Sequence, residues 1–76
     1  MNLTLFQRDD CPLCDEAHEQ LLAAGVADFD PIWIDGDAGL EAFYGTRVPV
    51  LRREDSGAEL DWPFDADRVR GFLRRG

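Results

Sequence analysis

Hydrophobic and polar residues alternate at the start of the chain and then change to a helical spacing. Residues 2–7 (NLTLFQ) alternate around Leu3 and Leu5, which predicts a β-strand. In residues 11–25 (CPLCDEAHEQLLAAG) apolar positions recur every three or four residues, which predicts an amphipathic helix. Gly25 stands where a C-terminal cap is expected. The apolar half of the helical wheel holds Leu13, Cys14, Ala17, His18, Leu21, Leu22 and Ala24.

The middle of the chain predicts a second strand and a short helix. Residues 28–35 (DFDPIWID) favour a strand around residues 32–34, and Pro31 near its start suits a strand at the edge of a sheet. The segment DGDAGLEAFYG then predicts a helix with Asp37 as its N-cap and Gly45 just beyond its end.

The last third of the chain predicts a hairpin and a final helix. The segments VPVLRR and AELDW are two short strands joined by EDSG, whose residues are typical of a tight turn. Residues 64–75 (FDADRVRGFLRR) then form the last predicted helix. Asp65 can cap this helix, and Phe64 can pack on Val69 as a hydrophobic staple.

The order β-α-β-α-β-β-α predicts an α/β fold with one four-stranded mixed sheet and helices on both of its faces. The first two strands are joined through a helix and should be parallel, with a right-handed crossover. The last two form a hairpin and should be antiparallel. The length of 76 residues suits a single domain, spanning residues 1–76.

Charge limits the partners that this chain can have. Its formal net charge is −8, and its eight basic residues are all arginines. An acidic protein is repelled by phosphate backbones and anionic membranes, so we expect neither nucleic acid nor membrane as a partner. With no signal peptide and no apolar run of about 20 residues, we expect a cytoplasmic protein. We also expect it to be a monomer. Reduced thiols prevail in the cytoplasm, which permits a transient catalytic disulfide more readily than a lasting structural one.

The two cysteines lie in RDDCPLCDE, where the first predicted helix begins. A C-x-x-C pair at such a position indicates redox chemistry. Pro12 suits the first helical position, which makes Cys11 the N-cap. The sulfur of Cys11 can then face the free backbone N–H groups of Leu13 and Cys14, which stabilise a thiolate together with the positive end of the helix. Cys14 lies deeper on the apolar side and should keep its proton.

This asymmetry suits thiol–disulfide exchange. The Cys11 thiolate attacks a disulfide sulfur, and Cys14 then attacks Cys11 and releases the reduced substrate. Nearby carboxylates oppose the effect of the helix on the thiolate, so we expect a reductant more than a strong oxidant. These acids are Asp9, Asp10, Asp15 and Glu16.

Two other interpretations of the cysteines stay open. A buried structural pair would need neither the proline nor the helix start. A zinc site wants four ligands, and His18, about 10 Å along the helix from Cys11, is the one further candidate. That distance is too large for both residues to bind one tetrahedral ion, so no metal ligands are assigned within the chain. The metal alternative is chiefly zinc or an iron–sulfur cluster shared between two chains. His18 itself suits the edge of the core, or it could tune Cys14.

Two segments, LFQRDDCPLC and RVPVL, resemble the glutaredoxin-like family of the thioredoxin superfamily, and the short bacterial glutaredoxin-like proteins in particular. The first resembles the family's strand followed by its C-P-x-C active site. The second resembles its valine-proline pair, with Pro49 35 residues after Cys14. The resemblance covers essentially the whole chain, and it implies a thioredoxin fold and a thiol–disulfide oxidoreductase.

The resemblance also implies how a substrate binds. Pro49 would be cis and lie against the cysteine pair, and the backbone of Val48 would pair with a disulfide-containing protein or with glutathione. Arg8 would contact a glutathione carboxylate, Arg47 is a further candidate contact, and Asp65 could accept the ammonium group. Pro12 and Leu13 between the cysteines complete the predicted substrate-binding set. No bound cofactor is expected, because glutathione would be a cosubstrate.

Some residues depart from the family's pattern. Leu13 replaces an aromatic residue, Arg47 replaces a threonine, and DWPF stands where a Gly-Gly pair is usual. Asp9 and Asp10 also bring negative charge to the site of an anionic ligand. These changes weaken glutathione specificity more than they weaken thiol chemistry. A non-catalytic adapter is the rival function, because an exposed surface around Trp62 and Phe64 could bind a partner protein, although rings of this kind also pack into cores.

Overall fold

Four strands and three helices follow one another in the predicted order, in a computed structural model that describes residues 2–74. The elements are β1 (Leu3–Gln7), α1 (Pro12–Ala23), β2 (Asp30–Trp33), α2 (Ala38–Tyr44), β3 (Val50–Arg53), β4 (Glu59–Asp61) and α3 (Ala66–Arg74). Position 75, which was predicted to be helical, lies outside the described residues. The second strand starts earlier than predicted, but Ile34 still donates its N–H to the carbonyl of Gln7.

The strands form one mixed sheet in the order β2-β1-β3-β4. β1 pairs in parallel with β2 and antiparallel with β3, so that Phe6 lies between Ile32 and Val50. β3 and β4 form the predicted antiparallel hairpin. β2 is an edge strand, as Pro31 indicated, and all residues of the central strand β1 are buried.

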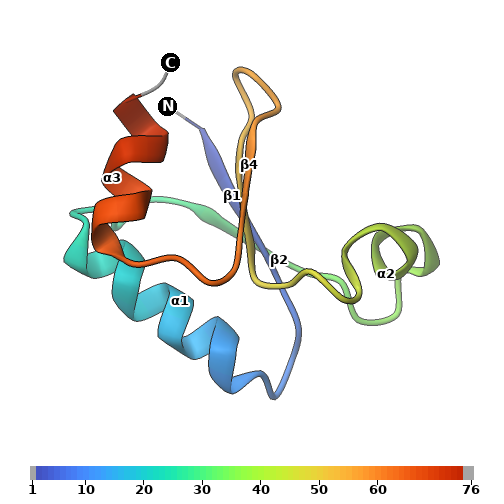
Figure 1. The fold of residues 1–76 in the computed structure, drawn as a ribbon. Coiled ribbons are helices and arrows are strands. Elements are labelled where there is room, and N and C mark those ends of the chain that lie inside the picture. The colour runs from blue at the N-terminus through green and yellow to red at the C-terminus, as the bar shows by residue number, and fades with distance from the viewer. Residues whose placement is uncertain (1, 75–76) are drawn as a thin grey trace.

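Helices cover both faces of the sheet (Figure 1). α1 and α3 lie on one face, and α2 lies on the other. Since side chains alternate along a strand, β1 contributes Leu3 and Leu5 to the first face and Phe6 to the second. The larger core is formed by Leu3, Leu5, Ala17, Leu21, Val26, Leu51, Leu60, Phe64 and Val69, and the smaller by Phe6, Ile34, Tyr44 and Val50.

α1 ends at the predicted place because glycine can adopt a left-handed conformation there. Gly25 has a φ of +84° and follows the C-cap residue. Its N–H bonds to the carbonyl of Leu22 at 3.0 Å, and the N–H of Val26 bonds to the carbonyl of Leu21 at 2.8 Å. These two bonds form a Schellman motif, which satisfies carbonyl groups that the helix leaves free.

The buried stripe of α1 is narrower than the apolar half of its helical wheel. Cys14, Ala17 and Leu21 are buried, but Leu13 and Leu22 are 45% and 63% exposed. A helix that packs on a sheet buries only the residues along its line of contact, so these two leucines stay exposed although they lie on the apolar half of the wheel. Leu13 is thereby left accessible beside the cysteines.

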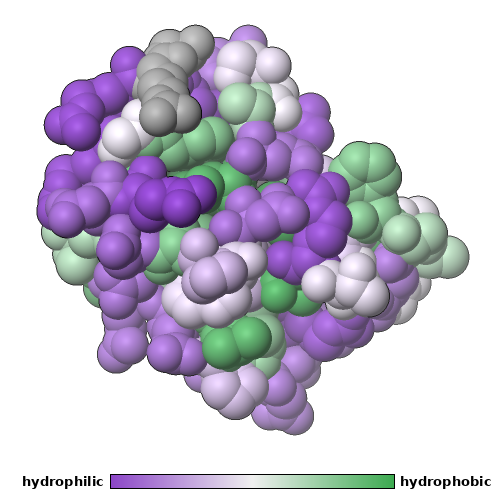
Figure 2. Space-filling view, in the orientation of Figure 1, coloured by the Kyte–Doolittle hydropathy of each residue, from purple (hydrophilic) through white to green (hydrophobic). Residues whose placement is uncertain are grey.

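The other two helices begin at the predicted caps. Asp37 accepts a hydrogen bond from the N–H of Leu40 at 3.0 Å, and Asp65 accepts one from the N–H of Arg68 at 2.8 Å. Phe64 and Val69 belong to the same core cluster, as expected for a staple. The surface seen in Figure 2 is mainly hydrophilic, with hydrophobic residues in separate patches. Within residues 2–74, no helix has the length and apolar character that crossing a bilayer requires.

Candidate active site

The two cysteines occupy the start of α1, where their surroundings differ. Cys11 is the N-cap, with an extended backbone, and its sulfur accepts a hydrogen bond from the N–H of Cys14 at 3.1 Å. Both side chains are free thiols. Cys11 is partly exposed, whereas Cys14 is only 3% exposed. The predicted arrangement of an accessible sulfur above a shielded one is therefore present.

Burial raises the pKa of Cys14 to about 12, and a hydrogen bond to the sulfur of Cys11 adds to this effect. The negative charges of Cys11 and Asp15 act in the same direction, while the backbone N–H of Arg8 opposes them. Cys14 is consequently protonated at neutral pH.

Pro49 has the conformation that the family resemblance implied. The peptide bond between Val48 and Pro49 is cis, and Pro49 is fully buried. The next residue, Val50, is paired with Phe6, so Pro49 lies at the end of β1 from which the chain continues to Cys11. A second cis bond, between Trp62 and Pro63, had no counterpart in the sequence-based prediction.

The backbone of Val48 was expected to pair with a substrate. In the structure its N–H already donates to the carbonyl of Tyr44 at 3.1 Å. One of the two main-chain groups of Val48 is therefore engaged within the chain.

Arg8 is held by a carboxylate on α2. Its two terminal nitrogens each donate to one oxygen of Glu41 at 2.7 Å, and one of them also donates to the carbonyl of Gly45 at 3.0 Å. This is the bidentate geometry that guanidinium and carboxylate groups favour. The hydrogen bond from Arg8 is the main reason why the pKa of Glu41 lies below its ordinary value.

Arg47 is held by two carboxylates of β4. It donates to both oxygens of Asp61, at 2.8 and 3.0 Å, and to Glu59 at 2.6 Å. Its guanidinium also lies over the rings of Phe43 and Tyr44, at 5.3 and 5.1 Å from their centroids. Both arginines of the predicted substrate set are thus paired within the chain.

A model of the glutaredoxin-like domain (DUF836) matches residues 2–74. The chain belongs to this family. Protein XcR50 from X. campestris is similar in its crystal structure, with 57% identity, a TM-score of 0.93 and coverage of 97% of each chain. Its solution structure has 56% identity and a TM-score of 0.91, with coverage of 100% of this chain and 96% of that one.

A more distant solved structure, Ne2328 from Nitrosomonas europaea, is 29% identical, with a TM-score of 0.77. The match covers 93% of this chain and 88% of Ne2328. No curated protein matches. The family match and these likenesses confirm the predicted resemblance and the thioredoxin-like fold of this glutaredoxin-like domain.

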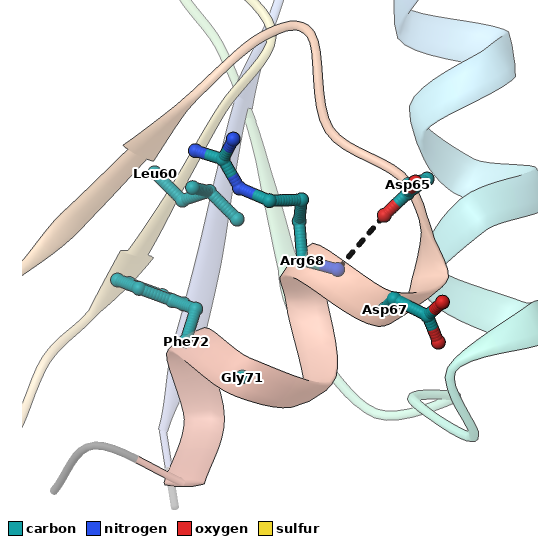
Figure 3. A pocket seen from close by; sticks show the side chains of 6 residues that line it. All are labelled: Leu60, Asp65, Asp67, Arg68, Gly71 and Phe72. Atoms are coloured by element: carbon teal, nitrogen blue, oxygen red, sulfur yellow. Dashed lines mark hydrogen bonds between the residues drawn. The ribbon is translucent and has the colours of Figure 1, made fainter.

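Asp65 serves the domain as the cap of α3 and borders a cavity away from the cysteines. An open cavity of about 530 Å³ lies between β4 and α3 (Figure 3). Its lining consists of Leu60, Asp65, Asp67, Arg68, Gly71 and Phe72. Neither cysteine lines this cavity, so Asp65 and the cavity are separate from the cysteine pair at the start of α1.

The remaining candidate residues of the glutaredoxin-like domain make contacts within the domain. His18 is half-buried, its Nε2 lies 2.7 Å from Oε1 of Gln7, and its ring meets Phe29 edge-on. Phe64 is buried and Trp62 packs against the same core, so core packing accounts for both rings. Within residues 2–74, no three His, Cys, Asp or Glu side chains gather closely enough to hold a metal ion.

The acidic partners of the two arginines were not among the residues predicted from the sequence. Glu41 lies 33 residues from Arg8, and Glu59 and Asp61 lie 12 and 14 residues from Arg47. No periodicity or motif links residues so far apart in the chain. An excess of acidic over basic residues was the one available signal, and it does not identify pairs.

Proposed function

We propose that this glutaredoxin-like domain is a thiol–disulfide oxidoreductase in which Cys11 is the nucleophile and Cys14 the resolving thiol. The supporting observation is the sulfur of Cys11 at the helix start, 3.1 Å from the N–H of Cys14, above a thiol that is 3% exposed. The amide donor and the helix dipole stabilise negative charge on Cys11. Cys14 stays neutral and shielded until it is needed.

The reaction transfers two electrons in two exchange steps. The Cys11 thiolate attacks one sulfur of a substrate disulfide, forms a mixed disulfide and releases the other substrate sulfur as a thiolate, which takes a proton from water. Cys14 then gives up its proton and attacks the sulfur of Cys11. The Cys11–Cys14 disulfide forms, and the second substrate thiol leaves. The substrate disulfide is thereby reduced and the protein dithiol oxidised.

The residues around Cys11 suit contact with a substrate. Leu13 is 45% exposed and Pro12 is also exposed, so both can touch the groups that flank a disulfide. Buried Pro49 shapes the neighbouring chain before β3, from which Val48 can offer its carbonyl. Regeneration of the dithiol needs an external thiol, either glutathione as a cosubstrate or a dithiol protein.

Trapping of the mixed disulfide tests this proposal. Reduced Cys14→Ser protein mixed with the neutral 2-hydroxyethyl disulfide should form one stable adduct on Cys11, seen by intact-protein mass spectrometry. The wild type should instead proceed to an internal disulfide. Cys11→Ser is the matched control, and its adduct on Cys14 should form much more slowly. Equal labelling of the two variants, or a wild type that keeps both thiols reduced, would contradict the assignment.

A further inference from the structure

We infer that the dithiol is specific for disulfides that carry positive charge, and that it discriminates against glutathione. This inference rests on the proposed function and names its substrate class. It comes from the charges around Cys11 that the ion pairs of the domain leave unneutralised. Each basic side chain predicted to bind glutathione is neutralised by carboxylates of the same chain, while several acids beside Cys11 are not neutralised.

Arg8 cannot bind a glutathione carboxylate without losing its present partner. Its guanidinium is bidentate with Glu41, both contacts are 2.7 Å long, and the two side chains are only 34% and 36% exposed. A carbonyl, that of Gly45, takes a further hydrogen bond. An incoming carboxylate would have to displace Glu41, which would then be left as an additional negative charge beside the substrate.

The guanidinium of Arg47 has more partners within the chain than that of Arg8. Two carboxylates, Glu59 and Asp61, share its guanidinium, and two aromatic rings lie against it. In this ion pair the Arg47 and Glu59 side chains are 29% and 17% exposed. Both carboxylates occupy the hydrogen-bonding groups of this guanidinium, so Arg47 is not a free positive charge for an anionic substrate.

The carboxylates nearest Cys11 lack such partners. Five exposed acids form no ion pair with any residue between positions 2 and 74. Four of them flank the cysteines in the sequence, and the fifth is brought in by the fold, because Asp35 accepts a hydrogen bond from the N–H of Asp9 at 2.9 Å. The five are Asp9, Asp10, Asp15, Glu16 and Asp35.

Unpaired charges of one sign around a reacting atom attract substrates of the opposite sign and repel those of the same sign. Glutathione disulfide is anionic at neutral pH and is therefore disfavoured. A protein disulfide flanked by lysine or arginine is favoured, and the exposed side chain of Leu13 offers an apolar contact beside it. The exchange step is the one proposed above, and only the rate of encounter with Cys11 changes.

Three small symmetrical disulfides of different charge test the inference. Cystamine is cationic, 2-hydroxyethyl disulfide is neutral, and 3,3′-dithiodipropionate is anionic. The rate of each with the reduced protein is divided by its rate with 2-mercaptoethanol, which corrects for intrinsic reactivity. At low ionic strength the corrected rate for cystamine should exceed that for the anionic disulfide about tenfold or more. Salt at about 0.5 M should remove most of this preference.

Charge variants locate the source of the preference. In Asp10→Asn/Asp15→Asn the ratio of cationic to anionic rates should fall about threefold or more. Asparagine suits position 10, whose φ of 51° is left-handed. Asp28→Asn removes one carboxylate at a distant place and serves as a control, because Asp28 lies beside Asn2 and Leu3, at the opposite end of β1 from Cys11. It should keep the wild-type ratio.

The possible failures can be told apart. If the neutral disulfide oxidises the protein but the corrected ratio is near one, the inference is wrong and the proposed function stands. The inference is also wrong if glutathione disulfide reacts faster than cystamine after correction, or if Asp28→Asn lowers the ratio as much as the double variant. If none of the three disulfides oxidises the protein, the proposed function and the inference fall together.

Discussion

Cys11 and Cys14 have the same side chain and differ in their environment. A separation of three residues at the start of a helix places one sulfur outside the first turn and the other on the buried side. The backbone N–H of Cys14 donates a hydrogen bond to the sulfur of Cys11. The division of roles that we propose therefore follows from position along the helix.

The buried thiol of Cys14 makes stability depend on pH in the alkaline range. Its pKa rises from the ordinary value of 9.0 to about 12 in the folded state, chiefly through burial. Between these values the folded protein holds one proton more than the unfolded chain. The free energy of unfolding should therefore fall by about 1.4 kcal/mol per pH unit as pH rises through this range.

Denaturant unfolding of the reduced wild type and Cys14→Ala, from about pH 8 to about pH 10.5, measures this effect. The difference between their free energies of unfolding should shift against the wild type as pH rises. Tyr44, whose pKa is also raised by burial, is present in both proteins and cancels. A difference that does not change with pH would show that Cys14 titrates normally in the folded protein.

Neighbouring arginines of β3 serve opposite faces of the sheet. Arg52 is partly exposed and pairs with Glu54 and Glu59. Arg53 is only 4% exposed, pairs with Asp55, and donates to carbonyls in the last turn of α3, including that of Leu73 at 3.1 Å. The strand thereby supplies the positive group that the end of this helix favours.

Arg53→Met should lower the free energy of unfolding by about 2 kcal/mol, because the carbonyls in the last turn of α3 lose the donor of a buried arginine. Arg52→Met is the matched control, and its surface ion pairs predict a loss below about 1 kcal/mol. Urea unfolding followed by circular dichroism measures both. Equal losses would mean that capping of α3 by Arg53 adds nothing to stability.

The domain as a whole brings parts of both faces of its sheet to the dithiol. β1 leads into the cysteines, β3 begins after Pro49 beside it, and α2 reaches back through the ion pair between Glu41 and Arg8. This pair joins Arg8, which precedes α1 in the sequence, to Glu41, which follows β2. It also controls whether the site presents a free positive charge.

Glu41→Gln should release Arg8 and reverse part of the substrate preference that we infer. The rate with an anionic disulfide should rise about threefold and the rate with cystamine should fall, because a free guanidinium attracts anions. Stopped-flow oxidation of the reduced variant measures both rates. Glu54→Gln makes the same change at the β3–β4 hairpin, at the far end of the sheet, and should leave both rates unchanged. Unaltered rates in Glu41→Gln would argue against the role assigned to this ion pair.

Local patterns in the chain were sufficient for the element order, the caps, the hairpin and the placement of the two cysteines. A cap, such as Asp37 or Asp65, lies three residues before the N–H group from which it accepts a hydrogen bond. The Cys11–Cys14 spacing has the same range. Backbone hydrogen bonding and helical geometry act over these short separations, so the responsible residues stand together in the sequence.

The folded structure alone decided whether the arginines of the site are free and which residues at its borders are exposed. Whether Arg8 is free depends on Glu41, a partner 33 residues away on an element whose position is set by packing of the smaller core. Likewise, Leu13 lies on the apolar side of its helix and yet is exposed, because the line of contact with the sheet passes it by. Charge pairing and burial are sums over neighbours in space, and the order of residues along the chain does not specify those neighbours.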